Sequence, residues 1–540
     1  MSDLSECTPA ETLASLYIAH NTLYYVFYSS GALYCLPPLP TSPELISIVL
    51  GQTCPQTIFT TSSLAHLFTQ ELRVLAPSRM PGCLQLHLEQ AGIPYTTTLL
   101  SLDEIMILGQ TTIEQLNVFG QYSISSLFQT VSPLGNVLLR EWLLRPSAVL
   151  KVIEDRQDAV RVLTLTQNAQ QLTEITRNLG HITHIPNLLY RMLTRNSLSH
   201  WQTLHSFILH AANIFCEIHA LAYSENVFFE PFHNTNIVTC LQGIATQINH
   251  IIDFDESVFQ SRCFSVKPGV DPELDDLKQA YHNLPATMAD AALQANRDHG
   301  LETEEELQIV YFPQLGFFIS APNSLNLGIP PQFRTAQATF YKTPIVLAID
   351  AEIGDIHSDI VDRETSHMQQ LRQLVMNNSE VLQKVSYDLA AIDCLASFAT
   401  CAVKLHLVQP SLSDTVTTVI TQGFHPLFSN NQGFVPNDTD FTRGTTIVIT
   451  GPNTCGKSVY LSQVATIVYM AQIGSFVPCA QANIKIVGCI ATVFPTRTST
   501  ELTSSYACDL QCMLHLLQLN DRSLILIDEF GQNTQSSGTI

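Results

Sequence analysis

Residues 445–460 read TTIVITGPNTCGKSVY, and this stretch decides the fold of the region around it. It contains the pattern G-x-x-x-x-G-K-[ST], which is the phosphate-binding loop of P-loop NTPases. The apolar run at 447–449 predicts a buried strand before the loop, and the apolar spacing through Val464 and Ile467 predicts a helix after it. A strand, a glycine loop and a helix N-terminus in this order direct backbone N–H groups toward a phosphate. The fixed positions of the pattern are Gly451, Gly456, Lys457 and Ser458.

The loop predicts a site for a nucleoside triphosphate with Mg²⁺. Lys457 is placed to reach the β- and γ-phosphates, and the Ser458 hydroxyl is placed to hold the metal ion. A chance match is the alternative, with a frequency of about 1% at typical residue usage. The predicted nucleotide-binding residues of the loop are Gly451, Pro452, Asn453, Thr454, Cys455, Gly456, Lys457 and Ser458.

Two carboxylates follow a second apolar run, SLILI at 523–527, which predicts a strand. At the carboxyl end of that strand, Asp528 can hold Mg²⁺ through a water, and Glu529 can orient or deprotonate an attacking water. Adjacent carboxylates are more often a solvated turn, but the apolar strand before them and the P-loop upstream favour the metal-binding interpretation. We therefore predict Glu529 and Lys457 as the catalytic residues.

The bulk composition indicates a large soluble protein. A chain of 540 residues is longer than one core normally organises, so we expect roughly three to five domains. The 14 cysteines form no C-x-x-C pair, which favours a reducing compartment and argues against a zinc site. No Lys or Arg precedes Arg73, and no apolar run reaches the ~18 residues of a membrane-spanning helix. We therefore expect a soluble, intracellular protein that does not bind a membrane.

The charge balance argues against strong binding of DNA to an open surface. Lys and Arg total 25 against 47 Asp and Glu, which gives a formal net charge of −22. Non-specific DNA affinity comes mainly from Lys and Arg that neutralise phosphates. Any DNA contact must therefore come from a local patch or from geometric enclosure.

The residue pattern changes along the chain from α/β to helical and back. Short β-branched and aromatic runs occupy the first ~110 residues, and amphipathic helical segments follow to about residue 265. Strands are predicted at 23–28, 57–60, 307–312 and 315–319, and helices at 271–298 and 345–400. A stripe with helical 3-4 spacing consists of Leu382, Val385, Leu389, Ile392, Ala396 and Ala399, and we interpret it as core packing.

Several longer motifs resemble the MutS family of DNA-clamp ATPases, and together they cover nearly the whole chain. The loop opens with Gly-Pro-Asn, as the family's loops do, and MAQIGSFVP follows its helix at 470–478. Further similar motifs are GFHP at 423–426, GFVPN at 433–437, SPLG at 132–135, LLREWLLRP at 138–146 and RQDAV at 156–160. The family resemblance implies that the nucleotide is ATP.

Other motifs resemble one eukaryotic branch of the family, known as the fifth homologue, which is meiotic. They are YFPQLGF at 311–317, FYKT at 340–343, GDI at 354–356, DRET at 362–365 and DEFG at 528–531. Mismatch readers of the family carry a Phe-x-Glu wedge in an N-terminal domain, and the first 110 residues here contain none. The match at 228–230 lies in the helical region, where we interpret it as packing. We therefore do not expect base-by-base mismatch detection.

The resemblance implies a multidomain fold that combines α/β and all-α parts. The expected parts are an α/β connector domain at 1–111, a helical core and lever domain at 112–266, a clamp segment at 267–345, lever helices at 346–407 and an incomplete ABC-type P-loop ATPase domain at 408–540.

The resemblance also implies roles for single residues. Phe434 would stack on adenine, although a core phenylalanine is the alternative. Ser504 or Ser505 would reach the γ-phosphate bound by a partner subunit, although a Ser/Thr run is usually a loop or helix cap. His425 is expected to be structural. Weak DNA contacts are expected from Lys267, Lys278, Arg334 and Lys342.

The sequence departs from the family pattern after residue 531. The family continues with a basic residue, Gly and Thr, whereas this chain has Gln532-Asn533-Thr534. The remaining strands of the family's ATPase sheet, its γ-phosphate-sensing histidine and its C-terminal dimerisation helices have no counterpart before Ile540. Either the sequence is truncated or a partner completes the ATPase fold, and we favour a truncated sequence. We expect DNA-dependent ATPase activity if the full ATPase domain is present.

The resemblance implies one function and leaves two alternatives. The implied function is an ATP-dependent clamp subunit that pairs with a second MutS homologue, expected to be the fourth paralogue. The pair would enclose double-stranded or branched DNA during meiotic recombination and crossover formation, in the nucleus and on chromosomes. The alternatives are a mismatch-repair MutS subunit and a scaffold that binds ATP without hydrolysing it.

Overall fold

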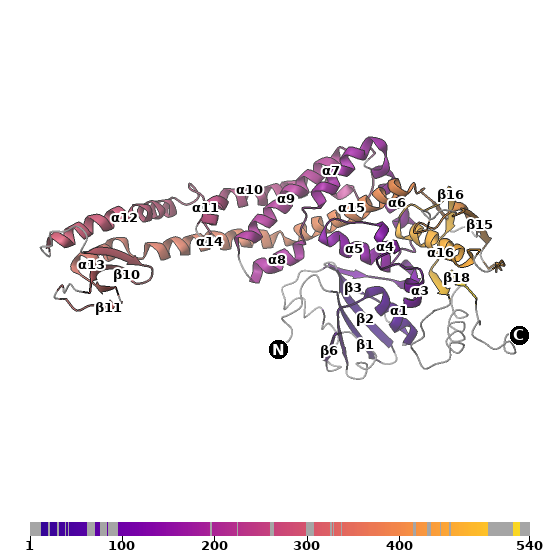
Figure 1. Ribbon diagram of the computed structural model, residues 1–540, viewed down its shortest axis with the longest axis horizontal. Coiled ribbons are helices and arrows are strands. Elements are labelled where there is room, and N and C mark those ends of the chain that lie inside the picture. The colour runs from indigo at the N-terminus through magenta and orange to yellow at the C-terminus, as the bar shows by residue number, and fades with distance from the viewer. Residues whose placement is uncertain are drawn as a thin grey trace. The chain divides into compact units, whose positions relative to one another are not determined.

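The computed structural model divides the chain into two compact units (Figure 1). The first comprises residues 1–196, 203–241 and 378–540, and the second comprises residues 197–202 and 242–377. The structure describes all residues except 1–11, 20–21, 30–31, 38, 41–42, 62–70, 76–83, 85–95, 195–196, 224, 260–263, 299–306, 324–326, 328, 336, 414–416, 429–433, 443, 453–454, 495–521 and 530–540.

A mixed β-sheet with helix α1 begins the first unit (Figure 1). Its strands run in the order β6-β5-β1-β2-β3-β7, and β4 pairs with β2. Alternate side chains of the strands face α1, and Leu16, Phe27 and Ile58 form a core there with Val49 of the helix. The two strands predicted in this region are confirmed. The bounds are β1 Leu13–Ala19, β2 Thr22–Ser29, β3 Ala32–Cys35, β4 Leu39–Pro40, α1 Pro43–Thr53, β5 Thr57–Thr61, β6 Glu71–Leu75 and β7 Thr96–Leu99.

The helical part of the first unit is built around α15, Ser379–Leu405. This helix packs against α5, α6, α7 and α8. Its predicted apolar stripe is buried from Leu382 to Ala399, which confirms the interpretation as core packing. Phe229 is fully buried as well, and Phe228 packs against Trp142, so the Phe-Phe-Glu stretch is packing too. The bounds are η3 Leu102–Glu104, β8 Ile107–Leu108, α3 Gln110–Gln115, α4 Ile124–Leu127, α5 Pro133–Leu144, α6 Leu150–Thr164, η4 Thr166–Asn168, α7 Ala169–Leu179, α8 Ile185–Thr194, α9 Leu198–His219, η5 Glu230–His233 and α10 Thr235–Ile251.

A buried carboxylate explains the SPLG motif at the start of α5. Asp393 of α15 accepts hydrogen bonds from the Ser132 backbone N–H at 2.7 Å and from the Ser132 hydroxyl at 2.6 Å. Negative charge is favoured at a helix N-terminus, because the first N–H groups have no intrahelical acceptor. Burial nevertheless raises the pKa of Asp393. A Cβ at Gly135 would lie 2.1 Å from the Asp393 carboxylate, so only glycine fits at this position.

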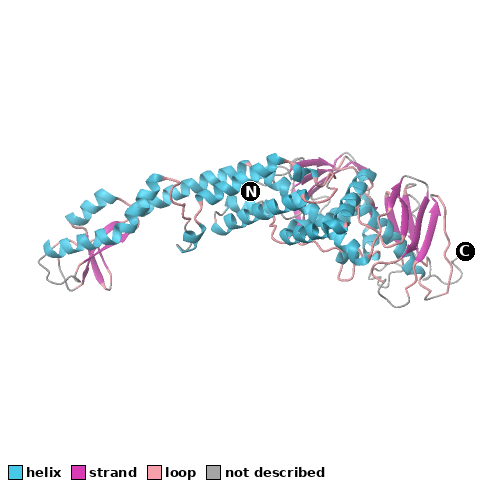
Figure 2. Cartoon of the chain, turned by 90° about the horizontal axis from the view of Figure 1, so that it is seen from above, coloured by secondary structure: helices cyan, strands magenta, loops and turns pink. Residues whose placement is uncertain are grey.

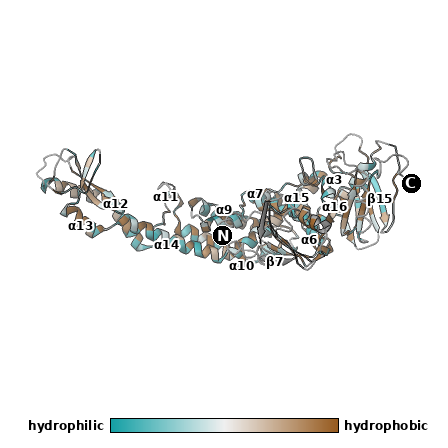
Figure 3. Cartoon of the chain, turned by 90° about the horizontal axis from the view of Figure 1, so that it is seen from below, coloured by the Kyte–Doolittle hydropathy of each residue, from teal (hydrophilic) through white to brown (hydrophobic). Residues whose placement is uncertain are grey.

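The second unit contains two long helices that pack on each other, α12 and α14 (Figure 2). Both carry hydrophilic and hydrophobic stretches (Figure 3). An antiparallel sheet of order β11-β12-β10-β9 packs against α12 and α13 through a core that includes Phe317, Ile319 and Val346. The bounds are α11 Phe254–Phe259, α12 Pro272–Asp298, β9 Gln308–Phe312, β10 Gly316–Pro322, β11 Phe333–Arg334, β12 Ala338–Tyr341, α13 Pro344–Ile353 and α14 Ile356–Asn377.

The elements predicted for residues 271–319 are confirmed by α12, β9 and β10. The region 345–400, predicted as one long helix or a pair, forms α13, α14 and α15. The first break falls at Gly354, whose φ of +67° is disfavoured for other residues. Within the described residues, no helix combines the length and the apolar character that crossing a membrane requires.

Two small sheets flank α16, Lys457–Ile473, in the last part of the first unit. One sheet has the order β13-β16-β14-β15, and the other consists of the parallel strands β18-β17-β8. Helix α16 packs against β14 and β18, so it contacts both sheets. The bounds are β13 Ser411–Ser413, β14 Thr417–Gly423, β15 Asn437–Thr442, β16 Gln481–Lys485, β17 Cys489–Val493 and β18 Ser523–Ile527.

The prediction of a buried strand at 447–449 is wrong. No described strand pairs with this run, and Ile447, Val448 and Ile449 are 55%, 80% and 37% exposed. An apolar run becomes a buried strand only where a neighbouring strand satisfies its backbone groups and another layer covers its side chains. Among the described strands, β18 pairs with β17 alone, and its Ile525 and Ile527 are 40% and 38% exposed.

Candidate nucleotide site

The glycine loop leads directly into the N-terminus of α16, as the sequence predicts. Gly456 has a φ of +95° and precedes Lys457, the first residue of the helix. The Lys457 ammonium turns back over the loop and donates to the carbonyl oxygens of Gly451 at 2.8 Å and Pro452 at 3.2 Å. The predicted residues Asn453 and Thr454 lie outside the described residues. The first two carbonyls of the loop therefore bond to the lysine that begins the helix.

The residues present fit a phosphate group. A Cβ at Gly451 would lie 2.9 Å from the Cys455 sulfur, so a side chain at this position would crowd the turn. Gly451, Cys455 and Ser458 are exposed, and the first N–H groups of α16 have no acceptor within the helix. Lys457 and Ser458 would hold the phosphates and the metal ion of Mg²⁺-ATP. Bound there, ATP supplies a γ-phosphoryl group that can be transferred to water.

The predicted acidic pair lies directly after β18. Asp528 is 7% exposed, and its backbone N–H donates to the Val493 carbonyl at 2.9 Å, which extends the pairing of β18 with β17. Glu529 is exposed and has a φ of +49°, in the left-handed region that non-glycine residues rarely adopt. Such backbone strain is concentrated at functional sites. Helix α16, which begins at the loop, packs against β18, the strand that the two carboxylates follow.

His425 occupies the structural position that the sequence predicts. Its Nε2 lies 3.2 Å from the Ser462 hydroxyl of α16, and its Nδ1 accepts from the Leu427 backbone N–H at 3.3 Å. The side chain is 2% exposed, and burial lowers its pKa to about 4. The imidazole is therefore neutral at physiological pH, and it contacts the first half of α16 through Ser462.

Phe434 is half-buried just before β15, and its contact with adenine stays a prediction. Ser504 and Ser505 lie outside the described residues.

Most of the predicted DNA contacts of the second unit bond within the chain. Lys278 forms an ion pair with Glu364 at 2.7 Å and donates to the Val266 carbonyl at 2.8 Å. Lys342 forms an ion pair with Asp350 and lies 4.4 Å from the centre of the Phe318 ring. Lys267 donates to the Asn249 carbonyl at 2.7 Å, whereas Arg334 is exposed on β11. The DNA contacts stay predictions, and two of the four side chains have carboxylate partners already.

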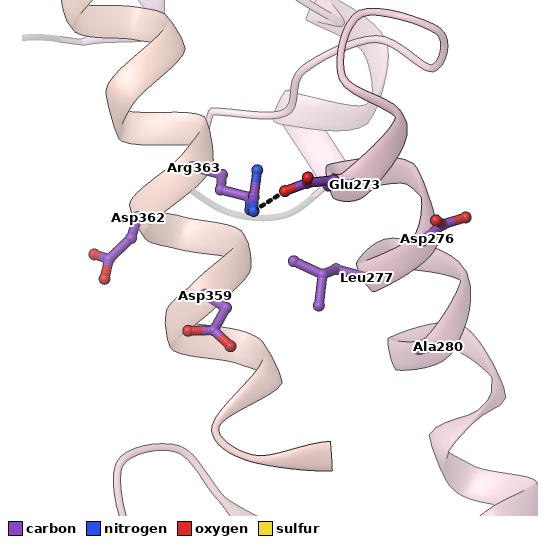
Figure 4. Close-up of a pocket in the computed structure, with 7 residues that line it drawn as sticks. All are labelled: Glu273, Asp276, Leu277, Ala280, Asp359, Asp362 and Arg363. Carbon is purple, nitrogen blue, oxygen red and sulfur yellow. Dashed lines mark hydrogen bonds and ion pairs between the residues drawn. The ribbon is translucent and has the colours of Figure 1, made fainter. Parts of the chain in front are cut away.

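A groove of about 670 Å³ lies between α12 and α14 and is mainly acidic (Figure 4). Arg363 pairs with Glu273 across the groove and with Asp271 at 3.3 Å. The other charged side chains of the lining are carboxylates, which repel a DNA backbone. The lining residues are Glu273, Asp276, Leu277, Ala280, Asp359, Asp362 and Arg363.

Nothing in the sequence predicts the contacts that hold the far end of α16. Arg156 and Gln157 of α6 donate to carbonyls in the last turn of α16. The RQDAV motif marked these residues, but no spacing rule connects α6 with a helix some 310 residues later. Glu154, Asp155 and Asp158 surround Arg156 in the sequence, so nothing there marks it as a buried side chain with a distant carbonyl partner.

The sequence matches two protein families along different parts of the chain. Residues 111–399 match the family described as MutS domain III, and residues 447–539 match MutS domain V. The first range covers the helical part that leads into α15 together with the whole second unit, and the second range covers the glycine loop, α16 and β18.

Three curated relatives show the same relationship over most of the chain. MutS protein homolog 5 of Saccharomyces cerevisiae is 28% identical over 82% of this chain and 55% of its own length. MutS protein homolog 5 of Caenorhabditis elegans is 29% identical over 78% of this chain and 32% of its own length. The DNA mismatch repair protein MutS of Chlorobium chlorochromatii is 28% identical over 83% of this chain and 53% of its own length. The chain thus spans about half, or less, of the length of these relatives.

Proposed function

The chain belongs to the MutS family, and from this premise we propose that it is an ATP-switched subunit of a DNA clamp in meiotic recombination. Its partner would be a second MutS homologue, expected to be the fourth paralogue. Together they would enclose double-stranded or branched DNA in the nucleus during crossover formation. The two eukaryotic relatives named MutS protein homolog 5 support this branch of the family.

The observation that carries the nucleotide part of the proposal is the loop at α16. Its Lys457 ammonium reaches back to the Gly451 and Pro452 carbonyls, and Gly456 gives the turn its positive φ. We propose that this region is an ABC-type P-loop ATPase domain. Lys457 and Ser458 would bind Mg²⁺-ATP, Asp528 would hold the metal ion through water, and Glu529 would orient the attacking water.

The charge distribution supports enclosure of DNA in a ring more than electrostatic binding of DNA to an open surface. The net charge is −22, the α12–α14 groove is acidic, and Lys278 and Lys342 are paired with carboxylates. A closed ring retains DNA by topology and therefore needs few phosphate contacts. Closure would be a population shift between two states of the dimer, biased by their different contacts with the γ-phosphate.

The nucleotide part is tested by titrating the purified chain with a fluorescent ATP analogue in Mg²⁺. Lys457→Met should weaken binding at least tenfold, since it removes a charge-assisted contact to the phosphates. Lys404→Met is the matched control, because Lys404 lies in the last turn of α15. Equal affinities of the wild type and Lys457→Met would refute the loop as the nucleotide site.

The clamp part is tested with the partner co-expressed. The complex on circular DNA should survive a challenge with high salt after ATP is added, and should be lost when the DNA is linearised. Loss from both DNA forms at the same rate would refute topological enclosure.

A mismatch-repair subunit is the second candidate, favoured by the relative named DNA mismatch repair protein MutS. It predicts tighter binding to a mispaired duplex than to the matched duplex, whereas the clamp proposal predicts equal binding. The third possibility, a scaffold that does not hydrolyse ATP, is tested by Glu529→Gln. If the variant and the wild type complex hydrolyse ATP at the same background rate, the enzyme role of Glu529 fails.

A further inference from the structure

Arg156 of α6 is a buried arginine at the end of the loop helix. Its Nη1 donates to the Ile473 carbonyl, the last of α16, at 2.9 Å. Its guanidinium carbon lies 3.8 Å from the centre of the Trp142 ring, and burial lowers its pKa to about 10. Gly474, which follows Ile473, has a φ of +93°, and a Cβ at Gly474 would lie 2.5 Å from the Arg156 Cβ. Arg156 therefore fills the space where α16 ends.

All three carbonyls at the end of α16 accept hydrogen bonds from residues of the segment 147–157. Besides Arg156 on Ile473, the Gln157 amide donates to the Ala471 carbonyl at 3.3 Å. The Ser147 backbone N–H donates to the Gln472 carbonyl at 3.1 Å. These three carbonyls belong to the four that a helix C-terminus leaves without intrahelical donors, and Ala471 also accepts from the Gly474 backbone N–H at 3.1 Å. A cation there also complements the helix dipole.

The same helix end is tied to α5 and, through α5, to the N-terminal sheet domain. The Tyr469 hydroxyl donates to the Leu143 carbonyl at 2.7 Å. The neighbouring Leu144 carbonyl accepts from the Gln52 amide of α1 at 3.2 Å. The end of α5 thus bonds to α16 and α1 through consecutive carbonyls.

Fold stability is a weak explanation for Arg156. Its Nε is buried and has no hydrogen-bond partner in the part of the chain that the structure describes. No carboxylate among the described residues forms an ion pair with it. Burying a charged side chain that has no acidic partner costs more folding free energy than burying an apolar side chain of the same length. What an arginine adds here is a fixed geometry, because its planar fork is stacked on Trp142 while it bonds to Ile473.

The two ends of α16 differ in burial. Residues Gln463–Ile473 are buried, whereas Gly456 and Ser458 at the other end are exposed. A helix of 17 residues is about 25 Å long and rigid along its axis. Fixing the buried end therefore sets where the exposed end, with the loop and Lys457, can lie.

We infer that Arg156 is a positioning residue for the nucleotide loop: it fixes the buried end of α16, and with it the loop geometry that binds triphosphate. This inference rests on the proposed function, because it assumes that the loop binds ATP. Gln157 assists with a weaker, neutral bond. The segment 147–157 is then the point through which the helical part and the nucleotide loop act on each other.

The test compares ATP-analogue affinity with thermal stability in four variants. Arg156→Met removes the donor and keeps the length, and Arg156→Lys keeps the charge. Gln157→Met removes only the amide, and it serves if Arg156→Met does not fold. Arg161→Met is the matched control on the same helix, since Arg161 is half-exposed and pairs with Asp158. Affinities are measured at a temperature where each variant's melting curve shows it to be folded.

Arg156→Met should weaken ATP binding about tenfold, Gln157→Met about threefold, and Arg161→Met not measurably. Arg156→Lys should recover most of the loss, because its ammonium can still donate to Ile473. Hydrogen exchange of α16 amides in the nucleotide-free protein should become faster in Arg156→Met and stay unchanged in Arg161→Met.

Other results overturn the inference in distinguishable ways. A folded Arg156→Met or Gln157→Met with wild-type affinity refutes the positioning role and leaves the proposed function intact. A wild type that binds no ATP refutes the proposed function. In that case unchanged exchange in Arg156→Met also refutes the claim that Arg156 fixes the helix.

Discussion

Replacing Gly135 by alanine tests the packing of α5 on α15 directly. The added Cβ would lie 2.1 Å from Oδ2 of Asp393 and 2.7 Å from the Ser132 hydroxyl oxygen, closer than real Cβ contacts allow. Either α5 moves outward or the Asp393 carboxylate turns away from the Ser132 donors. Overpacking costs about 1–3 kcal/mol and loss of the cap about 1 kcal/mol, so the free energy of unfolding should fall by roughly 2–4 kcal/mol.

Gly243 provides the matched control within another helix. A Cβ at Gly243 of α10 would meet nothing within 4 Å. Alanine is the better helix former, so Gly243→Ala should stabilise the protein by about 0.5–1 kcal/mol. The change from glycine to alanine should therefore lower the free energy of unfolding at Gly135 and raise it at Gly243. The difference between the two positions reflects side-chain packing and not helix propensity.

Urea unfolding followed by tryptophan fluorescence measures these effects, because Trp142 lies on α5 itself. The double variant Gly135→Ala/Asp393→Ala makes the test specific. Removing the carboxylate makes room for the methyl group. The losses in free energy of unfolding of the two single variants should therefore add up to more than the loss of the double variant, by more than about 1 kcal/mol. A loss below about 1 kcal/mol in Gly135→Ala, or simple additivity in the double variant, would refute the reasoning.

Three further predictions concern the loop, a buried acid and DNA. N-ethylmaleimide should block ATP binding by alkylating the exposed Cys455, and Cys455→Ala should keep binding after the same treatment even though Cys216 is exposed as well. Burial raises the pKa of Asp388 to about 6, so the folded chain binds a proton between pH ~4 and ~6 that the unfolded chain has released. Wild-type stability should fall as pH rises through this window, and Asp388→Asn should exceed the wild type by about 1–3 kcal/mol at pH 7 but not at pH 4, as urea midpoints would reveal. For this chain without a partner, the plot of log DNA affinity against log salt concentration should have a slope that corresponds to about three phosphate contacts or fewer. A much steeper slope would show an open basic surface, contrary to the internal pairing of Lys278 and Lys342.

The sequence predicted the elements whose signals are local. The stripe Leu382–Ala399 has a helical period over a length that only a packed helix explains, and it is buried throughout. The strands predicted at 307–312 and 315–319, on either side of Pro313, are both present as β9 and β10. The glycine loop was predictable because phosphate binding restricts several residue types at fixed spacing within eight positions.

The sequence failed where a structure depends on distant partners. The run at 447–449 has a strand's composition, but composition does not supply the neighbouring strand that buries it. Likewise, the sequence did not show that Lys278 and Lys342 pair with Glu364 and Asp350, which lie 86 and 8 residues farther along the chain. Short-range patterns cannot show which carboxylate reaches which lysine, because the pairing is decided by how α12, α14 and β12 pack.

The internal charge pairs and the anchored helix support one account of how such a chain would hold DNA. Lys278 and Lys342 already stabilise the second unit, so they add little positive potential to a DNA-facing surface. A clamp with few phosphate contacts must retain DNA by staying closed, and closure then has to be controlled by something other than DNA. In the proposed function that control is the nucleotide, and the loop that would bind it begins a helix whose other end is fixed by Arg156, Gln157 and Ser147. In the proposed function, an acidic chain of this kind would therefore depend more on the rigidity of α16 than a basic DNA-binding protein does, because its retention of DNA would come from a conformational state and not from surface charge.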